Sequence, residues 1–268
     1  MEQIQNNRVI TDLYRENAQF PGIALDGSDV YLCWQRFVDR HDSLMASCRR
    51  GDEVVWEREI SDGGEVLHPV ILAHGGAIWY AWSEYARENW RILARCYRDG
   101  QWGEVLTVAS GEALFFPRLF TWQGKLHVIW TEQHKGSAAA VLCPLTEAGP
   151  GAAETVSVVG EAYRAGAAEG GDGNLYVAYD GFDGKQYKLF ARARTAAGWS
   201  EEIVVSQGED WASTPWIAAK PDGAVVGWYD YGYMAVYSVR SADLTVRDGA
   251  LAAVNPQCLK ELSLIHIS

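Results

Sequence analysis

The stretch PVILAHGGAIWYAWSEYARENWRILARCYRDGQW (Pro69–Trp102) is one unit of a repeat that recurs along the chain. It opens with a proline and a short apolar run, turns at a Gly-Gly pair, and continues through an alternating run that ends at Trp82. A polar loop, a second alternating run and a turn before Trp102 complete the unit. Alternation of apolar and polar residues with a period of two is typical of half-buried β-strands.

The markers of this unit recur at a nearly constant spacing. The aromatic residue that ends the second run recurs every 48 or 49 residues, at Trp34, Trp82, Trp130, Tyr179 and Trp228. The opening proline recurs at Pro21, Pro69, Pro117 and Pro215. Each unit offers four strand-like runs, and the turns between them carry Gly and Asp, which favour hairpins. Four antiparallel strands at a period just under 50 residues predict an all-β fold, a β-propeller of about five four-stranded blades.

The repeat also predicts where the domain and its blades begin and end. We expect one domain over residues 1–260, with blades at residues 21–63, 69–111, 117–160, 164–209 and 215–254. Residues 8–13 (RVITDL) align with Glu202–Ser206 (EIVVS), an outer-strand position, so we expect an N-terminal strand that completes the last blade and closes the ring. The alternative is a frayed tail.

The last residues, 261–268 (ELSLIHIS), depart from the repeat and resemble translated vector sequence. If they are a non-native tail, the natural chain continues further, and the five units belong to a ring of six or seven blades.

Composition and charge restrict the classes of partner. The chain has 268 residues, 48% hydrophobic residues and 12 Trp, which is enough for a substantial core. A formal net charge of -12 without basic clusters argues against nucleic acid and against anionic membrane surfaces. No apolar run is long enough to cross a bilayer, and no signal-peptide pattern is seen. We expect a monomer that binds a small molecule, a glycan or a protein.

The cysteines and histidines predict no disulfide and no bound cofactor. Cys48, Cys96 and Cys143 occupy nearly one position of consecutive units, so they should lie about 10 Å apart, beyond the Cα reach of a disulfide, about 7 Å. Buried free thiols favour a reducing compartment such as the cytoplasm. The histidines form no zinc motif and no phosphate-binding loop is present, so we expect neither metal nor cofactor.

The loops that follow the second and fourth strands emerge on one face of the propeller, and they carry repeated carboxylates and non-repeating aromatics. Glu84, Glu132, Asp180 and Asp230 are assigned to one repeated position. Two interpretations stay open: hydrogen bonding between blades, or a recognition face where rings stack on sugars and carboxylates accept hydrogen bonds from hydroxyls. The candidate ligand-binding residues are Glu84, Tyr85, Trp90, Phe116, Tyr163, Trp211, Asp230, Tyr231 and Tyr233.

Two arginines lie at the start of innermost strands. Arg118 follows Pro117, and Arg164 lies near the matching place in the next unit. They form either an anion-binding pocket or neutralising pairs with nearby carboxylates. The candidate catalytic residues are Arg118, Arg164, Glu112, Glu132 and Asp180.

These patterns resemble the Tol-type and sialidase-like (BNR-repeat) β-propellers from Pro21 to about Arg240. The best local matches are GNLYVAYD (Gly173–Asp180) and ARARTAAGWS (Ala191–Ser200). The Asp-boxes of sialidases are absent, and only Arg118 and Arg164 have placements that match their three arginines. The resemblance to Tol-type propellers implies a binding module.

We therefore expect a non-catalytic propeller that binds a glycan or a peptide on its loop face, rather than an enzyme. One alternative is a sialidase-like glycoside hydrolase or polysaccharide lyase with a central carboxylate near Arg118 and Arg164. The other is a protein–protein scaffold. Carboxylates converging on a funnel would favour the enzyme, whereas a flat apolar rim would favour the scaffold.

Overall fold

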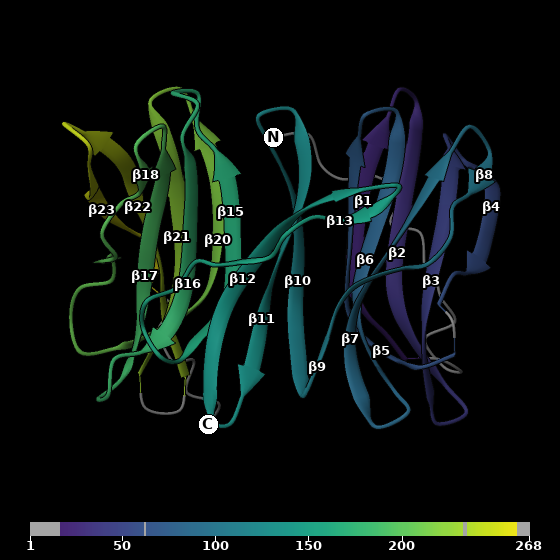
Figure 1. Ribbon diagram of the computed structural model, residues 1–268, viewed down its shortest axis with the longest axis horizontal. Coiled ribbons are helices and arrows are strands. Elements are labelled where there is room, and N and C mark those ends of the chain that lie inside the picture. Colours follow the sequence, from purple (N-terminus) through teal and green to yellow (C-terminus); the bar gives the residue numbers. More distant parts are fainter. Residues whose placement is uncertain (1–16, 62, 233–234, 262–268) are drawn as a thin grey trace.

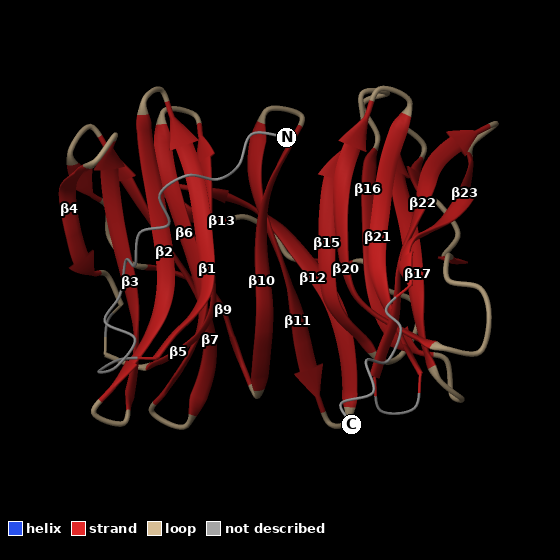
Figure 2. Cartoon of the chain, turned by 180° about the vertical axis from the view of Figure 1, so that it is seen from behind, coloured by secondary structure: helices blue, strands red, loops and turns tan. Residues whose placement is uncertain are grey.

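The computed structural model describes residues 17–61, 63–232 and 235–261. Every regular element in these ranges is a β-strand (Figure 1), and Figure 2 shows the same strands from behind. The predicted all-β fold is confirmed. The described residues therefore offer no helix to cross a membrane. The expected strand over residues 8–13, Tyr233 and residues 262–268 lie outside the described ranges.

The strands form five antiparallel sheets, and each sheet is one blade with its strands in chain order from the centre outward. Blade 1 contains β1 (Asn17–Asp26), β2 (Asp29–Val38), β3 (His41–Arg50) and β4 (Glu53–Glu59). Blade 2 contains β5 (Glu65–His74), β6 (Ala77–Ala86), β7 (Asn89–Arg98), β8 (Gln101–Trp102) and β9 (Leu106–Gly111). Blade 3 contains β10 (Ala113–Trp122), β11 (Lys125–His134), β12 (Ser137–Thr146), β13 (Gly149–Pro150) and β14 (Glu154–Thr155).

Blade 4 contains β15 (Ala162–Glu169), β16 (Leu175–Phe182), β17 (Tyr187–Thr195), β18 (Gly198–Trp199) and β19 (Ile203–Val204). Blade 5 contains β20 (Trp211–Lys220), β21 (Gly223–Gly232), β22 (Ala235–Arg247) and β23 (Ala250–Glu261). In blades 2, 3 and 4 the outermost position is divided between two short strands that both pair with the third strand. The expected four-stranded blades are therefore present, with an interrupted outer strand in three of them.

The repeated aromatic lies on the second strand of every blade and is buried. The exposed fractions are 6% for Trp34, 0% for Trp82, 1% for Trp130, 0% for Tyr179 and 2% for Trp228. Trp82 packs with Leu44 of blade 1, and Trp228 packs with Tyr176 of blade 4. The aromatics of blades 2 to 5 thus each cover the face of the preceding blade. This packing explains the repeat, because a single four-stranded sheet leaves both of its faces unburied.

Hydrophobic clusters join blades 1 and 2, 2 and 3, 3 and 4, and 4 and 5. The described residues form no corresponding cluster between blades 5 and 1, and Ile23 and Leu25 on β1 are largely exposed. Figure 1 accordingly shows blades 1 and 5 at opposite ends of the view, with blade 3 between them. Closure of the ring by residues 8–13 stays a prediction.

Each innermost strand contains a β-bulge at the same place. The pairing register shifts there in all five blades, and the bulge residue has a positive φ. These residues are Phe20 (50°), His68 (53°), Phe116 (55°), Arg164 (40°) and Thr214 (55°). A proline follows the bulge in four blades, and Ala165 takes its place in blade 4. The opening proline of the repeat therefore marks a bulge, where a missing N–H donor disturbs the sheet least.

The structure corrects the register assigned to Asp180. Position by position, Arg36, Glu84, Glu132 and Asp230 occupy equivalent places on their second strands. The blade 4 residue at that place is Gly181, opposite Ala162, whereas Asp180 lies opposite Tyr163 and is equivalent to Thr131. Because successive strand residues point to opposite faces, Asp180 faces away from the side that carries the other carboxylates.

The outer half of blade 5 is longer than the sequence predicts. The third and fourth strands pair up to Glu261, and they are joined by a turn at Asp248-Gly249 in which both residues have positive φ. An Asp-Gly pair with two positive φ values is the preferred composition of a tight hairpin turn. The expected end of blade 5 at residue 254 therefore missed the last part of a hairpin with two register shifts, and the Asp-Gly pair was the available signal for its turn.

The cysteine prediction is confirmed. Cys48, Cys96 and Cys143 are buried, and none of the five cysteines forms a disulfide. Burial raises the pKa of each of these three thiols. Cys48 and Cys96 occupy equivalent places of blades 1 and 2, whereas Cys143 is one residue out of that register and packs in a different cluster from Cys96.

Gly64 lies against a buried carboxylate, and this contact predicts a difference between two equivalent glycines. A Cβ at Gly64 would lie 2.4 Å from Cγ of Glu84, whereas a Cβ at Gly160, its counterpart in blade 4, would meet nothing within 4 Å. Gly64→Ala is expected to lower the free energy of unfolding by about 1–3 kcal/mol, the usual cost of overpacking. Gly160→Ala should leave it nearly unchanged in the same urea titration. Equal losses in the two variants would contradict the contact.

Candidate functional site

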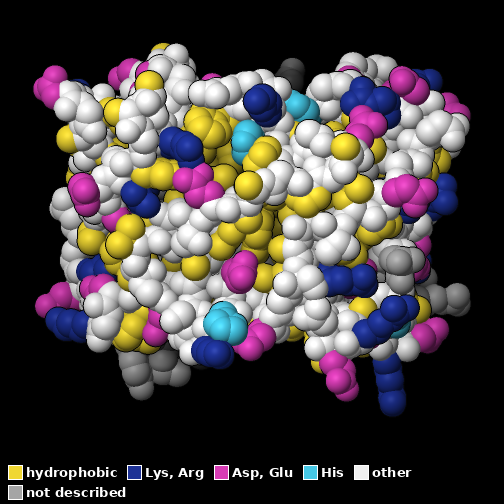
Figure 3. Space-filling model, viewed as in Figure 1, with side chains coloured by type: hydrophobic (Ala, Val, Ile, Leu, Met, Phe, Trp, Pro, Cys, Tyr) yellow, Lys and Arg dark blue, Asp and Glu magenta, His cyan; other side chains and the backbone are white. Residues whose placement is uncertain are grey.

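The five bulge residues meet near the propeller axis and line a cavity of about 510 Å³, which we call the central channel. Its wall consists of Phe20, Pro21, His68, Pro69, Val70, Phe116, Pro117, Arg118, Arg164 and Thr214. The volume is within the range of small-molecule sites, about 300–1,000 Å³. Figure 3 shows acidic and basic side chains interspersed over one face of the molecule, with apolar side chains visible in its hollowed middle.

Three ring side chains lie next to one another in the channel wall. The ring of His68 lies between two phenylalanines, with centroid distances of 4.9 Å to Phe20 and 4.3 Å to Phe116. Ring contacts continue outward from Phe116 to Phe115 at 6.1 Å, and from Phe115 to Trp90 at 4.6 Å. Trp90 contacts the exposed Tyr85 at 5.2 Å. A continuous row of rings therefore connects the loop face of blades 2 and 3 to the channel.

The two arginines of the channel differ in their partners. Arg164 donates two hydrogen bonds to the carboxylate of Asp180, one of them from Nε at 3.1 Å, and its backbone N–H donates to Oγ1 of Thr131 at 3.1 Å. Arg118 has no hydrogen-bond or ion-pair partner within residues 17–61, 63–232 and 235–261. The predicted neutralising pair with a carboxylate therefore exists for Arg164, whereas the charge of Arg118 is not neutralised.

Three of the candidate carboxylates are buried inside blades. Glu84 is paired with Arg91 and accepts a hydrogen bond from Nε1 of Trp82 at 3.2 Å. Asp230 is paired with Arg240 and accepts from Nε1 of Trp228 at 2.7 Å. Burial raises the pKa of Asp180 and of Asp230, and the paired arginines oppose this shift in part. The structure thus places Glu84, Asp180 and Asp230 away from solvent, each beside its own arginine.

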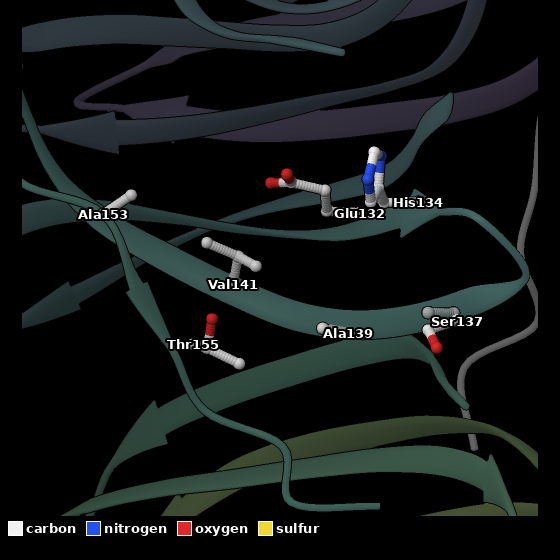
Figure 4. Close-up of a pocket in the computed structure, with 8 residues that line it drawn as sticks. Glu132, His134, Ser137, Ala139, Val141, Ala153 and Thr155 are labelled. Carbon is white, nitrogen blue, oxygen red and sulfur yellow. The ribbon is translucent and has the colours of Figure 1, made fainter. Parts of the chain in front are cut away.

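Glu132 lines a second cavity, on blade 3, which we call the blade 3 groove. The groove has a volume of about 280 Å³ and is lined by Glu132, His134, Ser137, Ala138, Ala139, Val141, Ala153 and Thr155. Figure 4 shows Glu132 and His134 side by side on β11, with Val141 on β12 and Thr155 on β14 beneath them. Within the described part of the chain, the Glu132 carboxylate has no hydrogen-bond or ion-pair partner.

A second carboxylate contacts the groove through His134. Oε2 of Glu112 lies 3.2 Å from Nδ1 of His134 and accepts a hydrogen bond from the backbone N–H of Lys135 at 3.3 Å. His134 and Glu112 are both largely exposed to solvent. Glu112, His134 and Glu132 therefore form one cluster on the loop face.

The remaining ligand-binding candidates form a separate aromatic cluster on blades 4 and 5. Tyr163 contacts Tyr187 at 6.2 Å, and Tyr187 contacts Trp211 at 5.8 Å. Trp211 is 54% exposed and lies opposite Tyr231 in the strand pairing. The candidates therefore divide between this cluster and the row of Tyr85, Trp90 and Phe116.

Sequence reasoning missed Phe20, His68 and Thr214 as channel residues. All three directly precede an opening proline that the repeat had identified. The residue before each proline was the available signal. The sequence alone could not show that this residue lies near the propeller axis. The bulge, which the sequence does not reveal, turns its side chain out of the regular alternation of the strand.

His68 predicts a pH dependence of stability. Burial, and then the charge of Arg118, lower the pKa of His68 from 6.5 to about 4. Between these two pH values His68 is protonated in the unfolded chain but neutral in the folded protein. The free energy of unfolding therefore falls as the pH drops from about 6.5 towards 4. At 1.36 kcal/mol per pKa unit, the loss is at most about 3 kcal/mol.

His68→Phe is expected to remove this component, because Phe20 and Phe116 already occupy the same backbone geometry in neighbouring blades. Urea titrations between pH 7 and pH 4 should show a smaller loss of stability for the variant than for the wild type. Parallel curves for the two proteins would contradict the burial of an uncharged imidazole.

Comparison with known proteins identifies several enzymes of similar fold. No protein-family model matches the sequence, and a search of characterised proteins finds no similar sequence. An α-L-arabinofuranosidase from Lactobacillus brevis is similar with a TM-score of 0.55 and 10% identity, over 89% of this chain and 94% of that chain. A mannose phosphorylase from Leishmania mexicana, in complex with a phosphate ion, is similar with a TM-score of 0.51 and 11% identity, over 82% and 81%.

A puromycin-hydrolysing peptidase from Mycobacterium tuberculosis is similar with a TM-score of 0.56 and 16% identity, over 90% of this chain and 37% of that chain. Further similar structures are family-43 glycoside hydrolases. At these identities the likeness shows the fold, and the predicted propeller is confirmed. These matches are not Tol-type or sialidase-like propellers, so that resemblance holds only for the propeller architecture found among glycan-active proteins.

The expectation of a non-catalytic binding propeller is corrected by these matches, and with it the expectation that the protein is not an enzyme. The similar structures named above are enzymes, and several of them are glycoside hydrolases. The alternative of a glycoside hydrolase agrees with them better than the binding module does.

Proposed function

We propose that the protein is a glycoside hydrolase whose active site is the cluster of Glu132, Glu112 and His134 on blade 3. The observation that carries the proposal is the unpaired Glu132 carboxylate in a groove that it shares with a histidine-bound second carboxylate. The similarity in fold to an arabinofuranosidase and to family-43 glycoside hydrolases supports the same reaction class.

The cluster has the groups that hydrolysis of a glycosidic bond requires. Most glycoside hydrolases use one carboxyl group to protonate the leaving oxygen and a second carboxylate as base or nucleophile. Glu132 carries no partner, so its oxygens are free to activate water or to attack the sugar. Glu112 lies 3.2 Å from a titratable imidazole, so the Glu112–His134 pair can deliver a proton.

An aromatic platform adjoins the cluster. Trp90 pairs with Gly111, the residue that precedes Glu112, and its ring lies between those of Tyr85 and Phe115. Aromatic faces stack on the CH faces of sugar rings. This platform is therefore suited to hold a sugar beside the carboxylates.

The test is a hydrolysis screen of arabino- and xylo-oligosaccharides, with reducing ends measured for the wild type and for Glu132→Gln. We expect the wild type to release reducing sugar and Glu132→Gln to lose this activity while it retains the wild-type unfolding profile. Glu53→Gln is the matched control, because Glu53 is exposed and lies on β4 of blade 1, two blades from the groove. Turnover that persists in Glu132→Gln would overturn the assignment of the site.

A further inference from the structure

The central channel carries positive charge in a protein of the opposite overall charge. The formal net charge of the chain is -12, yet the described channel wall contains two arginines, one histidine and no Asp or Glu. Arg164 is neutralised by Asp180 behind the wall. The uncompensated charge of the channel therefore belongs to Arg118.

Arg118 is solvent-accessible but enclosed by the channel wall. Its place after the bulge is taken by Gly22, Val70, Gly166 and Trp216 in the other blades, so the guanidinium has no counterpart around the axis. Desolvation by the surrounding wall lowers the pKa of Arg118, and no carboxylate offsets this cost. The exposed guanidinium therefore carries its charge in the channel without a counter-charge beside it.

A second channel residue also lacks a partner. Nδ1 of His68 is buried and forms no hydrogen bond within the described residues. His68 and Arg118 line the same cavity, and the charge of Arg118 contributes to lowering the pKa of this imidazole. The channel thus presents an unpaired guanidinium and an unpaired imidazole nitrogen beside two phenylalanine rings.

We propose that the central channel is a binding site for a small oxyanion, a carboxylate, sulfate or phosphate group, held by Arg118 and His68. Guanidinium binds such groups through two parallel N–H···O bonds, and the imidazole of His68, whose Nδ1 is buried and unpartnered, lies in the same wall. The rings of Phe20 and Phe116 flank this place, so a sugar or other body with an apolar face fits behind the anionic group. This site is separate from the blade 3 groove, and the inference does not depend on hydrolysis.

The probes are D-glucuronate, D-glucose, inorganic phosphate and inorganic sulfate, and their binding to the full chain is measured by calorimetry. We expect D-glucuronate to bind and D-glucose, which lacks the carboxylate, to bind far more weakly. Arg118→Gln should weaken D-glucuronate binding roughly tenfold to a hundredfold, the usual loss for a charged hydrogen bond. The matched control is Arg247→Gln, at an exposed arginine on β22, and it should leave binding unchanged.

The imidazole of His68 gives an independent readout in the wild type. A bound anion offsets the charge of Arg118, so the His68 titration followed by NMR should move to higher pH on addition of ligand. Arg118→Lys, which keeps the charge, should retain part of this effect. This measurement remains informative even if Arg118→Gln is poorly folded.

The outcomes separate the possible sources of the anion. Binding of inorganic phosphate or sulfate as tight as that of D-glucuronate would identify a free anion as the ligand, and binding of D-glucuronate alone would identify a sugar-borne carboxylate. D-glucose binding equal to that of D-glucuronate, unchanged affinity in a folded Arg118→Gln, or no saturable binding at millimolar anion would each overturn the site. Because binding is measured without turnover, failure of the hydrolase proposal leaves this result interpretable.

Discussion

Glu132→Gln is expected to lower the turnover number of glycoside hydrolysis by about 10²–10⁴-fold, the usual contribution of a general acid or base. The amide keeps the size of the side chain but cannot ionise, so it can neither activate water nor attack the sugar. Because Glu132 has no partner within the described residues, the substitution breaks no ion pair, and the unfolding transition should stay in place. The fall should be in kcat, with KM little changed.

Companion variants distinguish this role from a structural one. Glu112→Gln and His134→Asn should each lower kcat, and the two together should lower it by little more than either alone, because they act as one proton-donating pair. Measurement of kcat across pH separates the pair from Glu132. A rise in KM at unchanged kcat would show that Glu132 only binds the substrate, and a loss of stability that parallels the loss of activity would show that it serves the fold.

Trp82→Ala is expected to lower the free energy of unfolding by about 3–5 kcal/mol, as is typical for truncating a fully buried large side chain. Trp82 is 0% exposed and packs in the cluster that joins blades 1 and 2. The truncation also removes the Nε1 donor from the buried carboxylate of Glu84. A loss of this size is a large part of the 5–15 kcal/mol that stabilises a typical domain.

Trp211→Ala provides the matched control for this experiment. Trp211 is 54% exposed, so its removal should change the stability by much less in the same urea titration. Similar losses in both variants would indicate that Trp82 is not part of a buried layer between blades. A small loss for Trp82→Ala alone would do so too.

The fold follows from the sequence because its markers report on packing. A large aromatic residue every 48 or 49 residues fills the same position of each blade, and Trp34, Trp82, Trp130, Tyr179 and Trp228 are all buried there. Because every blade buries a residue at this position, the position recurs periodically in the sequence. Residues that differ from blade to blade, such as those of the site, produce no such periodic pattern.

The site could be predicted only in part. A count along the chain aligned Asp180 with Glu84 and Glu132, but blade 4 has one more residue between its bulge and its second strand, and the register places Gly181 there instead. A shift of one residue exchanges the two faces of a strand. The partners of Arg118 and Arg164 depend on three-dimensional neighbours, so the sequence left both the pocket and the neutralising pair open.

The left-handed bulges have a consequence for how the axis of such a protein can change. Phenylalanine, histidine, arginine and threonine all occupy the same strained backbone geometry in different blades, so that geometry does not prescribe the side chain. Each blade therefore offers one position whose chemistry is independent of the layers that hold the molecule together. The side chains at these five positions can be substituted one at a time. Selection for binding a ligand at the axis can therefore act without being opposed by selection for folding.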